Sequence, residues 1–472
     1  MSRNEDMNGC LVDVRTCGGT EVRNVVGPVA IVAGNDKDDK DKGKGKGKGG
    51  KAARKAREHV PLRFEEQALK HGGGGGAAAA FSGSESLDGG AVERFVVGRF
   101  DATLAFCIYF EHSFADKTAR TNVDDNVDGK GKGKVSYVQF VSRRATSSGD
   151  VSVSVTTHAV PVLSSYEELL SSADVRVAAV LLGKRAVERA LRMEETKDGG
   201  EAQVDARNAI DATVNGIAAA HKVRRGRTTA TAAAAATSTS GASSASTRHA
   251  TSGSSMEYAF PSELQQLPRT LFHLRQGPLL GNLLQHDDDV ACLRYLFLRF
   301  SLSESMRLMA PTLTMVTRNA QGEGQPLSFN VRTVPADTLA LWDDAVLALD
   351  YDAMFVWSGR NRLSSAFDPD RKAALQVLLD RSEGRFPSGA VGYLEEGSSM
   401  ERFLTARVAR TDRDPPEQQI ANFPELGAMG EGELQRLRDK FKGHVNNEMS
   451  FGAWFWKCQA TTFKALNNEK GL

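Results

Sequence analysis

The chain has 472 residues, of which 40% are hydrophobic and 25% are charged, and its formal net charge is +1. This length accommodates roughly two to four domains of ordinary soluble composition. A near-neutral chain has no overall field that would attract nucleic acid or an anionic membrane. The N-terminus has no signal-peptide pattern, and no apolar run reaches the ~18 residues of a membrane span. We therefore expect a cytosolic protein that binds no nucleic acid and meets membranes only peripherally.

The cysteines are dispersed along the chain and form no metal-binding pattern. No two make a CxxC pair, and no histidine lies near them at zinc-finger spacing. Five scattered thiols fit a reducing compartment, in which each is best interpreted as a buried small side chain. The sequence therefore predicts no metal or other cofactor. The five are Cys10, Cys17, Cys107, Cys292 and Cys458.

Three low-complexity stretches interrupt the chain, at residues 35–90, 128–134 and 224–255. They are rich in Lys and Gly or in Ala, Thr and Ser, and cannot bury enough apolar surface to offset their ordering entropy. We expect all three to be disordered insertions in surface loops. The Lys-rich stretch could attract acidic lipid or RNA, but a solvated expansion without a partner is the favoured interpretation. Its GKGKGKG run lacks the spacing of a phosphate-binding loop.

The first ordered block, residues 7–160, has the pattern of strands. Short apolar runs broken by Gly and Pro occur at residues 11–14, 25–32, 95–97, 104–110 and 137–141. Val151, Val153 and Val155 then alternate with polar residues, which predicts a half-buried strand after a hairpin turn at residues 147–149. Strands without helices between them favour an antiparallel β-sandwich.

The second block, residues 161–312, is helical. Ser172 is the expected N-cap of a helix, with Asp174 favourable near its positive end. One face of this helix carries apolar residues at helical spacing: Val175, Ala179, Leu182, Ala186 and Ala190. Further helices are expected at residues 201–221, 264–274, 290–300 and 303–309, the last ended by Pro311.

The third block, residues 313–414, mixes strands and helices. Apolar runs at residues 345–349 and 353–357 flank a hairpin turn, and a helix is expected at residues 371–379. A C-terminal segment, residues 415–472, is expected to be helical from about residue 432 to 468 and to pack on the helical block. Its apolar anchors are Phe451, Trp454, Phe455 and Phe463. The predicted fold class is therefore multidomain α+β.

A search for a self-contained active site finds no GxSxG, HExxH or Rossmann glycine pattern. His273 lies in an apolar helical pattern, where a core histidine is the simpler interpretation. The acidic run Asp287–Asp289 could bind a cation, but at the start of a helix it is more often a solvated cap. The sequence thus predicts a protein that is not an enzyme in its own right.

Several segments, in a fixed order, carry a family resemblance. They are LAFCIYF at residues 104–110, YVQFVSRRATSSGDVSVSVTTHAV at 137–160, FHLRQGPLL at 272–280, FLRFSLSESMRLMAPTL at 297–313, GRFPSG at 384–389 and GSSMERFL at 397–404. In this order they resemble the carboxy-terminal half of the GTPase-activating subunit of the COPII vesicle inner coat. The resemblance implies that the third block is a gelsolin-like domain. The paralogous cargo-binding subunit shares this architecture, but the segments from FHLR onward favour the activator.

The resemblance implies one catalytic residue, Arg402, acting in trans as an arginine finger. In this family the finger precedes a Phe-Leu pair and follows a Gly/Ser turn, as Arg402 does with Phe403-Leu404 and the turn at residues 397–399. A guanidinium from a partner neutralises charge that develops on the transferred phosphoryl group. Glu401 stands where the family has a small residue, and its carboxylate could pair with Arg402. The alternative interpretation is an ordinary surface arginine.

The implied function is activation of GTP hydrolysis by the small coat GTPase during transport from endoplasmic reticulum to Golgi. The implied partners are that GTPase, the cargo-binding paralog and the outer coat subunits, on the cytoplasmic side of the endoplasmic reticulum membrane and on COPII vesicles. The family's zinc finger and trunk precede the sandwich and have no counterpart in this sequence, so a truncated or divergent gene model is expected. Alternatives are a non-catalytic coat scaffold and a gelsolin-like actin binder.

Overall fold

The computed structural model describes most of the predicted ordered blocks. The described residues are 7–16, 20–27, 29–31, 92–100, 105–112, 135–145, 150–161, 163, 165–194, 199–237, 260–283, 286–319, 327–382, 389–412, 414–441 and 449–459. The Lys-rich stretches at 35–90 and 128–134, and Phe463, lie outside them. Within the described ranges, no helix is both long enough and apolar enough to cross a membrane.

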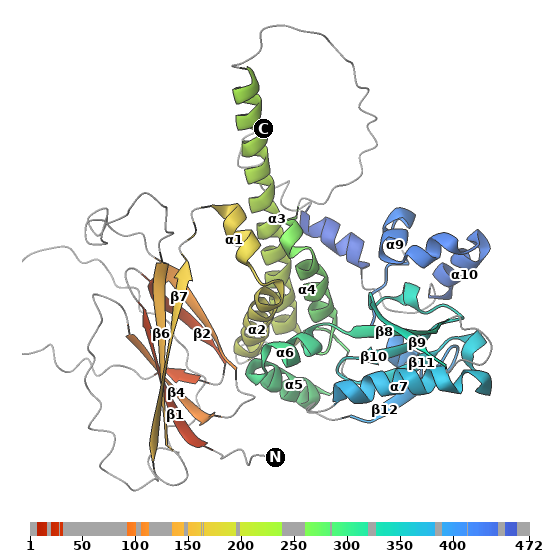
Figure 1. Ribbon diagram of the computed structural model, residues 1–472, viewed down its shortest axis with the longest axis horizontal. Helices are drawn as coiled ribbons and strands as arrows, with labels where there is room; N and C mark the ends of the chain where they lie inside the picture. The colour runs from red at the N-terminus through yellow and green to blue at the C-terminus, as the bar shows by residue number, and fades with distance from the viewer. Residues whose placement is uncertain are drawn as a thin grey trace, which may run out of the picture. The chain divides into compact units, whose positions relative to one another are not determined.

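The chain divides into two compact units, Met1–Glu168 and Leu169–Leu472. The first contains a five-stranded sheet in the order β3-β4-β1-β6-β7 and a two-stranded sheet, β2-β5. All its strand pairs are antiparallel, as the sequence predicts. The strands are β1 (Met7–Thr16), β2 (Thr20–Val26), β3 (Val29–Ile31), β4 (Val92–Phe100), β5 (Cys107–His112), β6 (Val135–Ala145) and β7 (Val151–Pro161) (Figure 1).

The core of the first unit lies on one face of the five-stranded sheet. Val12, Val14, Phe95 and Val138 point to this face and are buried. Val22 of β2 belongs to the same cluster, so the small sheet contributes to the cover of the large one. Two layers of antiparallel strands with a shared apolar interior form the predicted sandwich.

The opposite face of this sheet is polar near its centre. Asp13 is only 1% exposed and forms ion pairs with Arg94 (2.7 Å) and Arg143 (3.1 Å). The prediction of a half-buried β7 is wrong. Val151, Val153 and Val155 are 61%, 56% and 58% exposed, and the intervening Ser and Thr side chains are mostly exposed too. The physical reason is that β7 is the last strand of the sheet, with β6 as its one neighbour among the described strands.

The second unit begins with a group of packed helices. They are α2 (Val175–Glu194), α3 (Gly199–Thr237), α4 (Gln266–Gln276), α5 (Asp287–Arg299) and α6 (Leu302–Met309), with a short 3₁₀ turn, η3 (Ser262–Leu264), before α4. Figure 1 shows α2 in the middle of the group, and it contacts each of the other four. Ala179, Ala186 and Ala190 of its predicted face are buried.

Two details of these helices differ from the sequence prediction. Ser172 is the last residue of a separate helix, α1 (Tyr166–Ser172), and Asp174 caps α2 by accepting from the N–H of Arg176 at 2.8 Å. Asp174 stands directly before the first residue of α2, and its negative charge is favourable at the positive N-terminus of the helix. Its carboxylate is therefore a better cap than the hydroxyl of Ser172. Helix α3 continues to Thr237, past residue 224 where an insertion is expected, because its alanine-rich end has high helix propensity.

A second five-stranded sheet, in the order β12-β11-β10-β8-β9, follows. Its strands are β8 (Thr312–Arg318), β9 (Phe329–Val334), β10 (Val346–Asp350), β11 (Met354–Ser358) and β12 (Val391–Glu395). The β10–β11 hairpin is as predicted, and β12 joins parallel to β11. Helix α7 (Asp368–Ser382) covers one face through Ala374 and Leu378.

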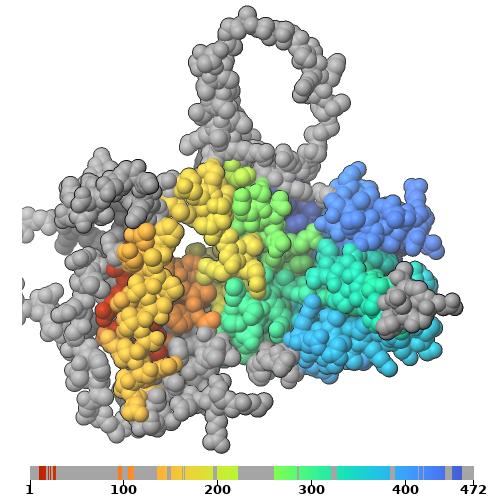
Figure 2. Space-filling view, viewed as in Figure 1, coloured from red at the N-terminus to blue at the C-terminus, as the bar shows by residue number. Residues whose placement is uncertain are grey.

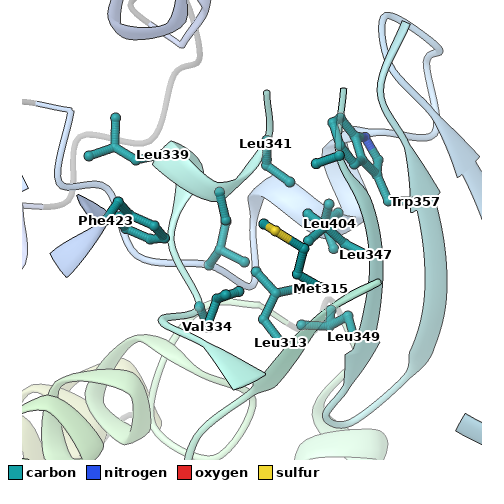
Figure 3. Packing of buried hydrophobic residues seen from close by; sticks show 14 of the residues in the cluster. Leu313, Met315, Val334, Leu339, Leu341, Leu347, Leu349, Trp357, Leu404 and Phe423 are labelled. Carbon is teal, nitrogen blue, oxygen red and sulfur yellow. The ribbon is translucent and has the colours of Figure 1, made fainter. Parts of the chain in front are cut away.

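The other face of this sheet holds a large apolar cluster. Figure 3 shows Leu313, Met315, Leu347, Leu349 and Trp357 from its strands together with Leu404 and Phe423 from later segments. The elements that contribute from beyond the sheet are η4 (Thr338–Ala340), α8 (Arg402–Thr405), η7 (Pro424–Ala428) and α10 (Glu431–Lys440). Phe423 lies between α9 (Pro416–Asn422) and η7. Every residue of β10 is buried because the sheet is covered on both faces.

The C-terminal segment is not one helix over residues 432–468. Helix α10 ends at Lys440, and a further helical stretch covers residues 451–459. Its anchors pack on the helical group, since the ring centroid of Phe272 lies 5.5 Å from that of Phe451 and 5.4 Å from that of Trp454. Trp454 also donates its indole N–H to Asp211 of α3 at 2.8 Å.

Candidate functional site

Arg402 begins the short helix α8, which follows β12 after a tight turn. Gly397 in that turn has a φ of +78°, a conformation that favours glycine because it has no Cβ. The N–H of Ser398 donates to the carbonyl of Glu395 at 3.1 Å, and that of Glu401 donates to the carbonyl of Ser398 at the same distance. The turn before Arg402 is therefore closed by its own backbone.

Glu401 faces into the protein and not toward Arg402. One carboxylate oxygen accepts from the indole N–H of Trp357 at 3.2 Å, and the other accepts from the N–H of Gly397 at 2.9 Å. The residue is 7% exposed, and Trp357 is fully buried. The expectation that this carboxylate could neutralise Arg402 is wrong, because both oxygens are used to hold the turn against β11.

Leu404 and Arg407, which both follow Arg402 in the sequence, anchor the helix to the sheet. Leu404 is fully buried in the cluster of Figure 3. Arg407 forms a fork onto Asp352 in the β10–β11 turn, with N–O distances of 2.8 and 2.6 Å. Its third nitrogen donates to the carbonyl of Phe403 at 2.8 Å. Paired bonds of this kind fix orientation as well as position, so the segment that carries Arg402 is tied down on both sides.

Lys440 of α10 completes the support below the turn. Its ammonium lies 3.0 Å from Glu396, 3.9 Å from Glu401 and 5.2 Å from the ring centroid of Trp357. Burial opposes ionisation of Glu396, but the N–H of Arg360 and the ammonium of Lys440 outweigh it and lower the pKa of that carboxyl. The negative charges of Glu396 and Glu401 are therefore compensated by Lys440 within the protein.

The side chain of Arg402 itself is exposed. Its guanidinium carbon lies 5.3 Å from the ring centroid of the adjacent Phe403. Among the described residues no carboxylate lies within ion-pair distance of it, whereas Arg407, five residues later, is fully engaged. A fixed backbone with an uncommitted guanidinium can present a positive, fork-shaped donor to an anionic group on another molecule.

The other candidate residues are structural. Burial, with the nearby charge of Arg269, lowers the pKa of His273 to about 3, so it is a neutral core residue in α4. Asp287, Asp288 and Asp289 form the exposed first turn of α5. No group of three potential metal ligands occurs within the described ranges, and the prediction of no zinc stays a prediction.

Sequence reasoning missed the residues that support Arg402. Trp357 lies 44 positions before Glu401, and Asp352 lies 55 positions before Arg407. No local spacing connects such pairs, because the parallel β11–β12 crossover brings them together. The one available signal was the Asp350–Asp352 turn, which places two carboxylates at the end of a sheet.

Known proteins resemble this chain in sequence and in fold. No family model matches the chain. It is 30% identical over 303 residues to the protein transport protein SEC23 A of Arabidopsis thaliana, a match that covers 64% of this chain and 29% of that protein. The crystal structure of the human COPII-coat protein Sec24c matches with a TM-score of 0.56 and 12% identity, over 98% of this chain and 46% of that chain.

The chain thus has the fold of a COPII-coat protein, in agreement with the predicted α+β class. In its sequence it is Sec23-like. The 12% identity to Sec24c shows a shared fold alone. The chain spans 29% of the length of SEC23 A and 46% of the Sec24c chain.

Proposed function

We propose that this chain is a COPII-coat component that stimulates GTP hydrolysis by the small coat GTPase, with Arg402 as an arginine finger. The observation that carries the proposal is the contrast between a braced backbone and a free side chain. Glu401, Leu404 and Arg407 hold the segment, while the guanidinium of Arg402 is exposed and unpaired among the described residues. The Sec23-like sequence supports the same assignment.

The chemistry of such a residue is electrostatic. GTP hydrolysis spreads negative charge over the transferred phosphoryl group, and a guanidinium placed against it stabilises the transition state. The stabilisation is largest when the donor is already oriented, because no free energy is then spent on ordering it during the reaction. The turn around Gly397 and the Arg407–Asp352 fork fix the backbone from which the Arg402 side chain extends, so only that side chain remains to be ordered.

The inward position of Glu401 matters for the same reason. A carboxylate beside the finger would cancel its charge and compete with phosphate oxygens. Here both carboxylate oxygens accept hydrogen bonds from Trp357 and Gly397. The residue that departs from the family pattern therefore serves as a brace for the finger.

The setting of this activity is part of the proposal. The chain would act with the cargo-binding paralog and the outer coat subunits, on the cytoplasmic side of the endoplasmic reticulum membrane. Its association with that membrane would be peripheral and would depend on the GTPase. The match to a protein transport protein and the COPII-coat fold support this setting.

The test is single-turnover GTP hydrolysis by the coat GTPase, alone and with this chain, scored beside a pull-down. Arg402→Ala should bind the GTPase but lose about 10³-fold or more of the stimulation. Arg402→Lys should recover little, because a point charge cannot replace the fork. Arg436→Ala is the matched control, since Arg436 is an exposed arginine whose guanidinium donates to the carbonyl of Gly432 in the same helix, α10. Binding without any stimulation by the wild type would favour the scaffold alternative.

A further inference from the structure

Strand β7 is an unusually open edge of the sheet in the first unit. It has eleven residues and pairs with β6 on one side, while none of the described strands pairs with its other side. Val151, Val153 and Val155 are each more than half exposed. In Figure 2, β6 and β7 belong to the visible surface of this unit. An edge of this kind presents a row of backbone donors and acceptors that can pair with another strand.

This edge carries none of the usual protection against pairing. Soluble proteins block sheet edges with charged side chains, proline or bulges. Residues 151–160 contain no Lys, Arg, Asp, Glu or Pro, and Pro161 stands only at the far end. The pairing of β6 with β7 runs without a register shift from Ala145–Val151 to Val135–Pro161. By comparison, edge strand β9 of the second sheet carries Arg332, which pairs with Glu425.

The exposed residues also form a palindrome. Residues 151–155 read Val-Ser-Val-Ser-Val, so the segment has the same sequence in both directions. Two antiparallel copies related by a two-fold axis at Val153 would place every residue opposite its own type. We propose that β7 is the contact surface of a symmetric dimer, in which the occupant of the edge is β7 of a second copy of this chain.

The pairing satisfies both faces of the sheet at once. Val153 would lie opposite Val153 of the second copy, and Val151 opposite Val155, so that the three valines of each strand form one apolar row. On the other face Ser152 would lie opposite Ser154, where cross-strand hydroxyl pairs are favourable. Asp150 would lie opposite Thr156, so no like charges meet. A slip by one residue would place valine opposite serine throughout, and a slip by two would keep only two of the three valine pairs, so the axis at Val153 gives the largest number of matched pairs.

Dimerisation about this axis would join two five-stranded sheets into one continuous sheet. An isologous contact closes after two copies, so it yields a discrete dimer and no filament. The contact lies in the first unit and uses none of the residues around Arg402. The inference is therefore independent of the proposed GTPase activation.

The first test is the oligomeric state of the full chain, measured by sedimentation equilibrium over a range of concentrations. The wild type should form a dimer, and Val153→Lys should weaken dimerisation at least about tenfold, because two like charges then meet on the axis. Val331→Lys is the matched control. Val331 is a 46% exposed valine on edge strand β9, and its replacement should leave the dimer unchanged. A wild type that stays monomeric at the highest concentration measured overturns the proposal.

The second test fixes the register by cysteine cross-linking in a Cys292→Ser background, because Cys292 is exposed. Val153→Cys should form a disulfide-linked dimer on mild oxidation, since paired residues of adjacent strands lie within disulfide reach. Val151→Cys alone should not, but an equal mixture of Val151→Cys and Val155→Cys chains should form the mixed dimer. Equal cross-linking of Val151→Cys alone and Val153→Cys would contradict the two-fold pairing. A dimer that survives Val153→Lys unchanged would place the contact elsewhere.

Discussion

The two five-stranded sheets of this chain bury their residues differently. In the sheet β12-β11-β10-β8-β9 both faces are covered, and every residue of β10 is buried. In the sheet β3-β4-β1-β6-β7 one face is covered, and the valines of β7 lie in solvent. A continuous apolar run such as Val346–Leu349 correctly predicts a central strand. Alternation, as in Val151–Val155, shows only that two faces differ and does not say that either is buried.

The largest expected effect on stability comes from truncating a buried side chain of the sheet that is covered on both faces. Leu347 lies on the central strand β10, fully buried in the cluster of Figure 3. Leu347→Ala should lower the free energy of unfolding by about 2–5 kcal/mol, because it removes apolar contacts and leaves a cavity. Denaturant unfolding with a tryptophan signal would measure it, since Trp357 lies in the same cluster. If Leu347→Ala lowered the free energy of unfolding by no more than a substitution of an exposed valine does, the sheet would not be covered on both faces.

A second consequence of the cover is a buried acid. Burial raises the pKa of Asp337 to about 6, even though the N–H of Leu339 donates to its carboxylate at 3.0 Å. Between pH 3.8, the ordinary pKa of an aspartate, and about pH 6, the folded state holds a proton that the unfolded chain has lost. Stability from this group is thus complete at low pH and is lost as pH rises through this window.

Asp337→Asn tests that consequence because the amide oxygen can still accept from Leu339. From pH 4 to pH 7 the variant should gain about 1–3 kcal/mol relative to the wild type. Unfolding curves at both pH values measure the difference. Parallel pH dependence of the two proteins would show that Asp337 does not carry the shift.

A smaller effect is expected at the turn that leaves the covered sheet. Gly397→Ala should cost about 1–2 kcal/mol, since a residue with a Cβ is strained at a φ of +78°. Gly389→Ala is the control, because Gly389 has ordinary backbone geometry and open space around its Cα. Thermal unfolding of both variants separates backbone strain from loss of glycine as such. A Gly397→Ala protein as stable as the control would mean that the turn is not held in this conformation.

The smallest effect is expected on the open sheet. Val155 is 58% exposed, so Val155→Thr should change the free energy of unfolding by less than about 0.5 kcal/mol. The measurement belongs at low protein concentration, where self-association does not contribute. A loss of more than 1 kcal/mol, well above the ~0.5 kcal/mol of ordinary surface changes, would mean that this face is covered after all.

Much of the fold follows from local sequence. The hairpin between β10 and β11 is encoded by two apolar runs around Asp350–Asp352, and α6 ends before Pro311 as its missing N–H requires. The predicted cap of α2 was wrong by two residues because both Ser172 and Asp174 are residue types that cap helices. The structure distinguishes them, since Ser172 ends α1 and Asp174 accepts from the N–H of Arg176. The end of α10 at Lys440 was not predicted, although Gly443 follows it within three residues and glycine is a common signal for a helix end.

Less of the candidate site than of the fold could be predicted from the sequence. Arg402 could be named from its resemblance to a family motif, but its exposure depends on where Glu401 points. That direction is decided by the indole of Trp357, which reaches the turn through the pairing of β11 with β12. A contact between residues far apart in sequence cannot be read from spacing. The same holds for the Arg407–Asp352 fork.

The most direct test of the central claim is binding of the chain to the coat GTPase in two nucleotide states. One state holds GDP alone, and the other holds GDP with aluminium fluoride, which mimics the transferred phosphoryl group. The wild type should bind the second state at least about 10²-fold more tightly, because a finger acts on the transition state and not on the product. Arg402→Ala should bind both states about equally. If Arg402→Ala keeps the full preference for the aluminium fluoride state, Arg402 is not the finger.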